Sequence, residues 1–194
     1  MKSEQNNQVK VWDIFIRVFH WTLVTSFFIA YLTEDDFEIL HTNAGYFVLI
    51  LLAIRLVYGL IGSKYARFSD FIYPFKTTIQ YLKDVLSFRG KRYIGHNPAG
   101  GLMIIALMMS LAVTGVTGMG AYATEERAGP LVNLIQFLPY SLARTLEDVH
   151  EFFANFTILL VFVHVSGVIF ESLSHRENLI KSMLNGFKHK NIQS

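Results

Sequence analysis

The sequence contains no cysteine among its 194 residues. This excludes disulfide bonds, covalent attachment of a c-type haem through a Cys-x-x-Cys-His motif, and iron–sulfur or blue-copper sites that need a thiolate. The net charge is small, +2 at neutral pH, which argues against nucleic acid as a partner. Histidine is therefore the residue expected to hold any metal that this chain binds.

Charged residues are also scarce, at 16% of the chain against 52% hydrophobic residues, which is typical of a membrane protein surrounded by lipid. Four apolar segments lie at about residues 14–31, 44–62, 98–119 and 149–171, and each is near the length of about 17–25 residues that a bilayer demands. We therefore expect an all-α integral membrane four-helix bundle that forms a single domain over residues 1–194.

Lysine and arginine are absent from residues 33–38, between the first two apolar segments, but frequent between the second and third segments and after the fourth. The positive-inside rule counts these basic residues, so both termini and the second connection are expected in the cytoplasm. No small-residue cleavage site follows the polar N-terminus, so the first apolar segment is interpreted as a retained span and not a signal peptide.

Two of the connections are predicted to be structured. Residues 75–86 carry apolar side chains at helical spacing, which favours an amphipathic helix lying on the cytoplasmic leaflet. Residues 129–149 are apolar but interrupted by Pro139, too broken to span the membrane. They are expected to form a short helical segment at the outer face, as a lid or docking surface.

Four of the seven histidines lie in or beside the apolar segments. His150 and His164 are fourteen residues apart, which on one helix gives roughly 21 Å along the axis and roughly 40° around it. With the orientation above, depth alone pairs His20 with His164 in the inner half and His41 with His150 near the outer face. Because ionisable residues inside a membrane are costly and usually functional, we expect two non-covalent haem b groups, each with two histidine ligands.

Three further residues are candidates for contacts with the cofactors. Arg17 precedes His20 by three positions and could pair with a haem propionate, or extend to the cytoplasmic interface instead. Arg55 lies deeper in its segment, which favours the propionate role. His96, at the cytoplasmic entry of the third segment, could meet a propionate or a quinone head group, or serve as a capping or interfacial residue.

Small residues near the histidines could leave room for a flat macrocycle. Gly45 is one turn from His41, and Gly167 is close to His164. The third apolar segment has no histidine in its middle but carries Gly100, Gly101, Gly115 and Gly118. Small residues are common wherever membrane helices pack, so this pattern is consistent with haem without being specific to it.

Taken together, these residues resemble the bacterial diheme cytochrome b561 family, which includes the b-type cytochrome subunits of nickel–iron hydrogenases. The similar stretches run over nearly the whole chain: Val11-Trp12-Asp13, Arg17 with His20-Trp21, His41 with Gly45, Arg55 with Gly59 and Gly62, Tyr65-Ala66-Arg67-Phe68, Gly95-His96-Asn97-Pro98, Thr117-Gly118, His150-Glu151, His164 with Gly167, and His175-Arg176-Glu177-Asn178-Leu179. The resemblance implies a multi-pass protein of the bacterial inner membrane with four core helices and two haem b groups. It also implies His20, His41, His150 and His164 as the ligands, and electron exchange between the quinone pool and a partner at the outer face.

Two histidine ligands on each iron would leave no open coordination position, which favours electron transfer over chemistry at iron. We expect a carrier between quinone or quinol and a periplasmic partner such as a c-type cytochrome, with the direction open. One rival function is a superoxide oxidase-like enzyme that passes electrons to quinone, which the acidic outer connections disfavour because superoxide is an anion. The sequence is also compatible with a cytochrome b subunit of a nickel–iron hydrogenase and with an assembly subunit that binds no haem.

Overall fold

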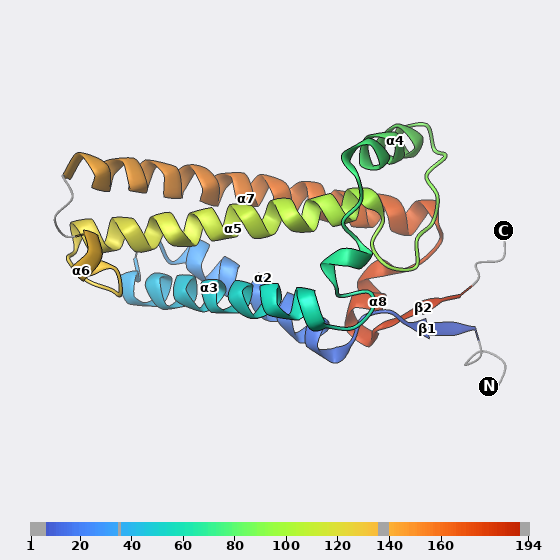
Figure 1. The fold of residues 1–194 in the computed structure, drawn as a ribbon, viewed down its shortest axis with the longest axis horizontal. Helices are drawn as coiled ribbons and strands as arrows, with labels where there is room; N and C mark the ends of the chain where they lie inside the picture. The colour runs from blue at the N-terminus through green and yellow to red at the C-terminus, as the bar shows by residue number, and fades with distance from the viewer. Residues whose placement is uncertain (1–6, 35, 136–139, 191–194) are drawn as a thin grey trace. The chain divides into compact units, whose positions relative to one another are not determined.

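The fold is almost entirely helical, as Figure 1 shows for a computed structural model that describes residues 7–34, 36–135 and 140–190. Its elements, in chain order, are β1 (Gln8–Lys10), α2 (Ile14–Leu32), α3 (Glu38–Ile61), the 3-10 turn η1 (Phe68–Asp70), α4 (Phe75–Leu86), α5 (Pro98–Glu125), α6 (Val132–Ile135), α7 (Tyr140–Ser174), α8 (Leu179–Asn185) and β2 (Phe187–His189). The expected all-α class is confirmed.

Four of the helices in the described part of the chain, α2, α3, α5 and α7, are long and apolar enough to cross a membrane. The protein is therefore a multi-pass membrane protein. Large apolar side chains on these helices remain exposed, for example Leu60 at 74% and Phe162 at 68%, as expected for surfaces that face lipid. Helix α7 begins nine residues before the expected segment at 149, because the polar turn around Arg144 and Asp148 continues the helix beyond its apolar part.

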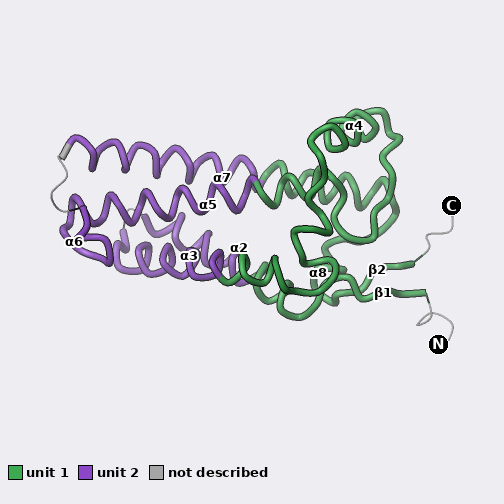
Figure 2. Tube along the Cα trace, in the orientation of Figure 1, with its two compact units in different colours: residues 1–21, 54–105, 162–194 green, residues 22–53, 106–161 purple. Residues whose placement is uncertain are grey.

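The chain forms two compact units, coloured separately in Figure 2. Unit 1 comprises residues 1–21, 54–105 and 162–194, and unit 2 comprises residues 22–53 and 106–161. Each of the four long helices contributes one part to each unit, so each unit contains its own group of four helix segments.

Unit 2 is held together by an apolar cluster and by hydrogen bonds between helices. The cluster centres on Phe27, Val48, Leu52 and Leu111. Beside it, the buried hydroxyls of Ser110 on α5 and Thr157 on α7 lie 2.7 Å apart. Polar contacts of this kind between membrane helices contribute about 0.6 kcal/mol each, so tight packing supplies most of the cohesion.

Unit 1 brings the two ends of the described chain together. Strands β1 and β2 pair antiparallel, with Val9 opposite Lys188. The Lys188 ammonium lies 3.8 Å from the Glu177 carboxylate, which also accepts two hydrogen bonds from the Arg92 guanidinium, at 2.9 and 3.3 Å. The side chains of Glu177 and Lys188 are only 5% exposed, so each charge depends on the others for compensation.

Asp13 fixes the start of α2 within unit 1. One carboxylate oxygen accepts the Ile16 amide at 2.9 Å, and the other accepts the hydroxyls of Tyr58, also at 2.9 Å, and Ser63. Burial alone would raise the pKa of Asp13, but the hydrogen bonds from Ser63, Ile16 and Tyr58 hold this pKa below its ordinary value. An ionised Asp13 therefore joins α2, α3 and the connection that follows α3.

The two structured connections differ in how much of them the structure describes. Helix α4 covers the expected residues 75–86, exposes Phe75 and Leu86, and buries Tyr81, whose hydroxyl donates to the Glu171 carboxylate at 2.7 Å. In the connection at residues 129–149, residues 132–135 form helix α6 and residues 140–149 are the first turns of the long helix α7, not part of a separate short segment, whereas Pro139 lies outside the described residues.

Candidate functional site

The four histidines of the long helices lie as two ring pairs, one in each unit. The ring centroids of His20 and His164 are 6.5 Å apart in unit 1, and those of His41 and His150 are 5.9 Å apart in unit 2. A metal–imidazole nitrogen bond is about 2 Å long and the ring centroid lies roughly 1 Å behind the nitrogen, so two imidazoles on opposite sides of one metal have centroids about 6 Å apart. Both pairs have the spacing of two ligands to a single metal.

Space for a flat group adjoins each pair. A Cβ atom added at Gly45 or at Gly167 would meet no heavy atom of the described chain within 4 Å. Gly45 follows His41 by four positions and Gly167 follows His164 by three, so each glycine shares a helix face with a paired histidine. The donor set and the adjoining space both fit a haem with two histidine ligands.

Main-chain carbonyls orient the two rings of unit 2. The Nδ1 atom of His41 lies 2.9 Å from the Ala30 carbonyl oxygen, and the Nδ1 atom of His150 lies 2.8 Å from that of Thr114. Because a carbonyl oxygen can only accept, each Nδ1 must carry the proton, which leaves Nε2 with a free lone pair. This is the usual arrangement of a metal-binding imidazole.

Gly118 allows this approach on α5. A Cβ atom at this position would lie 2.6 Å from the Nδ1 atom of His150, closer than real side chains tolerate. The absence of a side chain at Gly118 therefore lets the His150 ring reach the Thr114 carbonyl one turn away.

The ring of His20 in unit 1 has different surroundings. Its Nδ1 atom is enclosed and has no hydrogen-bond partner among the described residues. The ring packs edge-on against Trp21, with centroids 5.0 Å apart. Packing against Trp21 therefore positions this ring, whereas no carbonyl of the described chain does so.

The two candidate arginines both belong to unit 1. Arg55 is 4% exposed, donates to the Ala66 carbonyl at 2.8 Å, and lies against the Phe68 ring at 5.0 Å. Arg17 donates to the Leu184 carbonyl. The Nη1 atom of Arg55 and the Nε atom of Arg17 are enclosed and have no partner among the described residues. Each guanidinium thus retains a donor for a carboxylate.

His96 lies in the same unit, between the rings of Trp12 and Phe71, at centroid distances of 4.5 and 4.9 Å. Its Nδ1 atom has no partner in the described chain. Burial, followed by the nearby cations of Lys188 and Arg55, lowers the pKa of His96 to about 3. His96 is therefore a neutral imidazole at pH 7, able to donate or accept one hydrogen bond.

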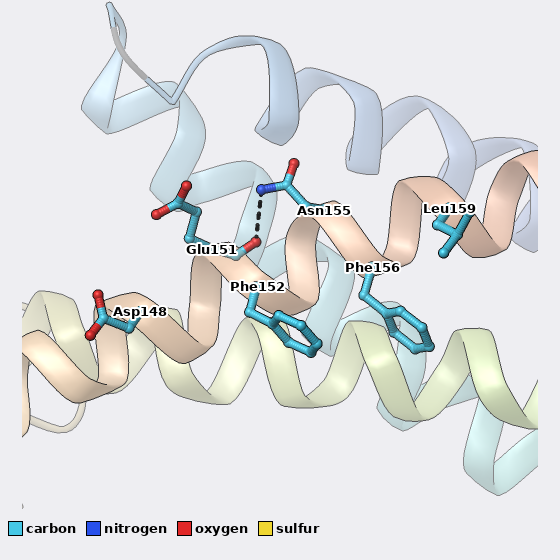
Figure 3. A pocket seen from close by; sticks show the side chains of 6 residues that line it. All are labelled: Asp148, Glu151, Phe152, Asn155, Phe156 and Leu159. Carbon is cyan, nitrogen blue, oxygen red and sulfur yellow. Dashed lines mark hydrogen bonds between the residues drawn. The ribbon is translucent and has the colours of Figure 1, made fainter.

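A shallow groove runs along the exposed side of α7, next to His150 in the sequence (Figure 3). Two acidic residues, Asp148 and Glu151, lie at one end. The rings of Phe152 and Phe156 stack within 7° of parallel along its wall, and Asn155 donates to the Glu151 carbonyl at 3.1 Å. The groove therefore presents negative charge beside an aromatic surface.

Long apolar helices that carry histidines in pairs inside helix bundles define the protein as a membrane cytochrome of the b type. The match to a family model specifies the class further: residues 11–186 match the prokaryotic cytochrome b561 model, and the chain belongs to that family. It is a haem-binding electron-transport protein, and the resemblance seen in the sequence is confirmed.

Named relatives match nearly all of the chain. It is 24% identical to a protein of Rhizobium leguminosarum bv. viciae, over 95% of this chain and 90% of the relative. It is also 24% identical to proteins of Azotobacter vinelandii, covering 96% and 91% of the two chains, and of Cupriavidus necator, covering 92% and 86%. All three are named probable Ni/Fe-hydrogenase B-type cytochrome subunits.

The carbonyl oxygens of Ala30 and Thr114 are the parts of the site that sequence reasoning missed. Every residue carries a carbonyl group, so no side-chain type marks these positions. Gly118 gave a signal, as a small residue within an apolar segment, but the same signal is present at Gly115, whose Cβ would meet Leu49 instead.

Proposed function

We propose that this protein is a diheme cytochrome that carries electrons through the bacterial inner membrane, between quinone and a redox partner at the outer face. One haem b is held by His20 and His164, and the other by His41 and His150. The observation that supports this proposal best is the spacing of the two ring pairs, 6.5 and 5.9 Å between centroids, which suits two ligands on one metal.

The bound haem supplies reversible one-electron chemistry, and the chain's own residues hold and orient it. Arg17 and Arg55 each have an enclosed donor without a partner in the described part of the chain, which suits the carboxylates of haem propionates. His96 is the third candidate for these carboxylates, or for a quinone head group, as a neutral hydrogen-bonding imidazole in the same unit. With two histidines on each iron, oxygen has no free position at which to bind.

The orientation follows from the distribution of basic residues, with both termini and the α4 connection in the cytoplasm. The partner then meets the acidic connections that directly precede α3 and α7. A basic surface on a periplasmic c-type cytochrome would suit them, and so would a hydrogenase, the kind of complex to which the named relatives are assigned.

The test begins with purified protein. Haem extracted with acid acetone and measured as the pyridine complex should give two haem b per chain, since no cysteine tethers the group. A ratio near one, or a c-type spectrum, would contradict the diheme proposal. Absence of any visible absorption band would leave only an assembly role.

Electron transfer is tested in liposomes that contain the protein with quinol when a candidate acceptor is outside, or with quinone when a candidate donor is outside. Exchange with a c-type cytochrome or a hydrogenase supports the carrier, and each is tried separately. Consumption of superoxide with reduction of quinone, and no exchange with either protein, would instead favour the superoxide oxidase-like function.

A further inference from the structure

The two histidine pairs differ in the hydrogen bonds made by the Nδ1 atoms of their rings. In unit 2, Nδ1 of His41 and of His150 each donates to a main-chain carbonyl, whereas in unit 1 the enclosed Nδ1 of His20 has no partner in the described chain. A donated hydrogen bond makes an imidazole a more basic ligand. A more basic ligand stabilises the oxidised, more positive metal, so it lowers the reduction potential of the site.

The two units also differ in charge, and this difference acts on the two reduction potentials in the same direction as the hydrogen bonds. Over the whole sequence, residues assigned to unit 1 include fifteen lysines and arginines against six acidic residues, whereas those of unit 2 include two against nine. Arg55, buried to 4% exposure, places one of these cations inside unit 1. Positive surroundings favour the reduced metal, because reduction removes one positive charge from it, and the effect is strongest where water is excluded.

From these differences we propose that the chain sets the reduction potential of the His41–His150 site below that of the His20–His164 site. The carbonyls of Ala30 and Thr114 lower the first potential, and Arg55 raises the second. The inference rests on the proposed function, since it requires a haem at each pair.

This ordering gives electron transfer a preferred direction. With a haem held at each pair, one electron would pass from the His41–His150 site, oxidising it, to the His20–His164 site, reducing it. The electron comes from the partner at the outer face and passes on to quinone, and no ligand has to exchange. Within the proposed orientation, the protein therefore reduces quinone with electrons drawn from outside.

The first measurement is an optical redox titration of the full protein in detergent, which should resolve two waves. H164A and H150A each retain one pair and thereby assign the waves. The wave that remains in H164A should lie lower, by at least about 59 mV, which is a tenfold preference in a one-electron equilibrium. Equal potentials or the reverse order would overturn the proposal.

Gly118 gives a specific test of the hydrogen bond. In G118A the new methyl group displaces His150 from the Thr114 carbonyl, so the lower wave should rise and the low-spin ferric EPR signal of that site should shift. The matched control is G120A, two residues along α5, whose new methyl group first meets the flexible Leu146 side chain, at 2.9 Å from its Cδ1 atom. Equal shifts in the two variants would overturn the role of the carbonyl.

Arg55 tests the second half of the ordering and remains informative if G118A fails to bind its haem. R55Q should lower the upper wave and leave the lower one in place, whereas R67Q removes an exposed cation of the same unit and should move neither. An upper wave unchanged in R55Q would contradict the role of the buried cation. A wild-type protein with one haem or none would refute the proposed function instead, so the two failures are distinguishable.

Discussion

Replacing His150 by glycine should remove one of the two proposed haem groups and leave the other intact. The structure gives the size of this effect, because the His41–His150 pair lies within unit 2 and the His20–His164 pair within unit 1, with no histidine common to both. The ratio of haem to protein should fall from two to one, and so should the number of low-spin ferric EPR species. The mirror variant His164→Gly should lose the other species.

Restoring haem binding with added imidazole distinguishes the loss of one ligand from general damage to the fold. A glycine within a helix costs about 1 kcal/mol relative to alanine, and this cost is similar for the two variants, which both lie on α7. The deleted side chain leaves space for one imidazole, as engineered cavities accept the molecule that they lack. Added imidazole should therefore restore the second haem in each variant without restoring a covalent link.

His175→Gly is the matched control. This histidine follows α7 directly and its ring contacts Glu171 at 3.3 Å, away from both ring pairs, so the variant should retain two haems. Each ligand variant should keep one reducible haem yet lose transfer between quinol and the outer partner. Full turnover in His164→Gly, with one haem missing, would refute the idea that electrons pass through both sites.

Three other predictions address orientation, docking and packing. A reporter enzyme that works only outside the cytoplasm should be active within residues 33–39 and silent at the C-terminus, and the opposite pattern would reverse the orientation. Neutralising Asp148 and Glu151 together should slow the reaction with a basic partner up to tenfold at low salt and hardly at all at high salt; a decrease independent of salt would rule out electrostatic docking. Gly101→Ala would press a methyl group against the main-chain carbonyl of Phe71, so it should cost about 1–3 kcal/mol of stability. This corresponds to a thermal midpoint lower by about 2–4 °C per kcal/mol, and an unchanged midpoint would mean that the backbone yields.

Much of the fold could be predicted because lipid imposes a simple rule on the sequence. A span must be helical and apolar, so four apolar segments define four helices. The ends of the helices were harder to predict, since the first turns of α7 mix apolar Leu142 and Leu146 with charged residues such as Arg144. Asp13 did carry a sequence signal, as a helix-capping residue directly before an apolar run, but its contacts with Tyr58 and Ser63 depend on tertiary packing.

The pairing of β1 with β2 could not be predicted. Each strand has three residues, too few for an alternating pattern, and the partners are separated by almost the whole chain. The buried ion pairs of Glu177 with Arg92 and Lys188 were also missed. Charged residues in polar segments usually remain in water, so their sequence gives no sign that they are buried.

The histidines themselves were accessible to sequence reasoning, because a histidine in an apolar span is rare and its depth can be counted. The difference between the two pairs was not accessible, since it arises from main-chain carbonyls and from which helix segments pack together. Sequence predicts which residue types are available as ligands, whereas packing determines what each histidine ring contacts.

The distribution of basic residues links orientation to direction of electron flow. In the proposed orientation the connections rich in lysine and arginine lie in the cytoplasm, and the same cations favour the reduced state of the site in their own unit. An electron that moves inward crosses toward the negative side of an energised membrane, at a cost of about 2.3 kcal/mol for a full crossing at 100 mV. A tenfold difference in affinity for the electron is worth about 1.4 kcal/mol and offsets more than half of that cost. The rate of inward transfer should therefore fall as the membrane potential rises, and at every potential it should be lower in an Arg55→Gln protein than in the wild type. Equal rates in the two proteins would mean that the buried cation of Arg55 does not tune the site in its unit.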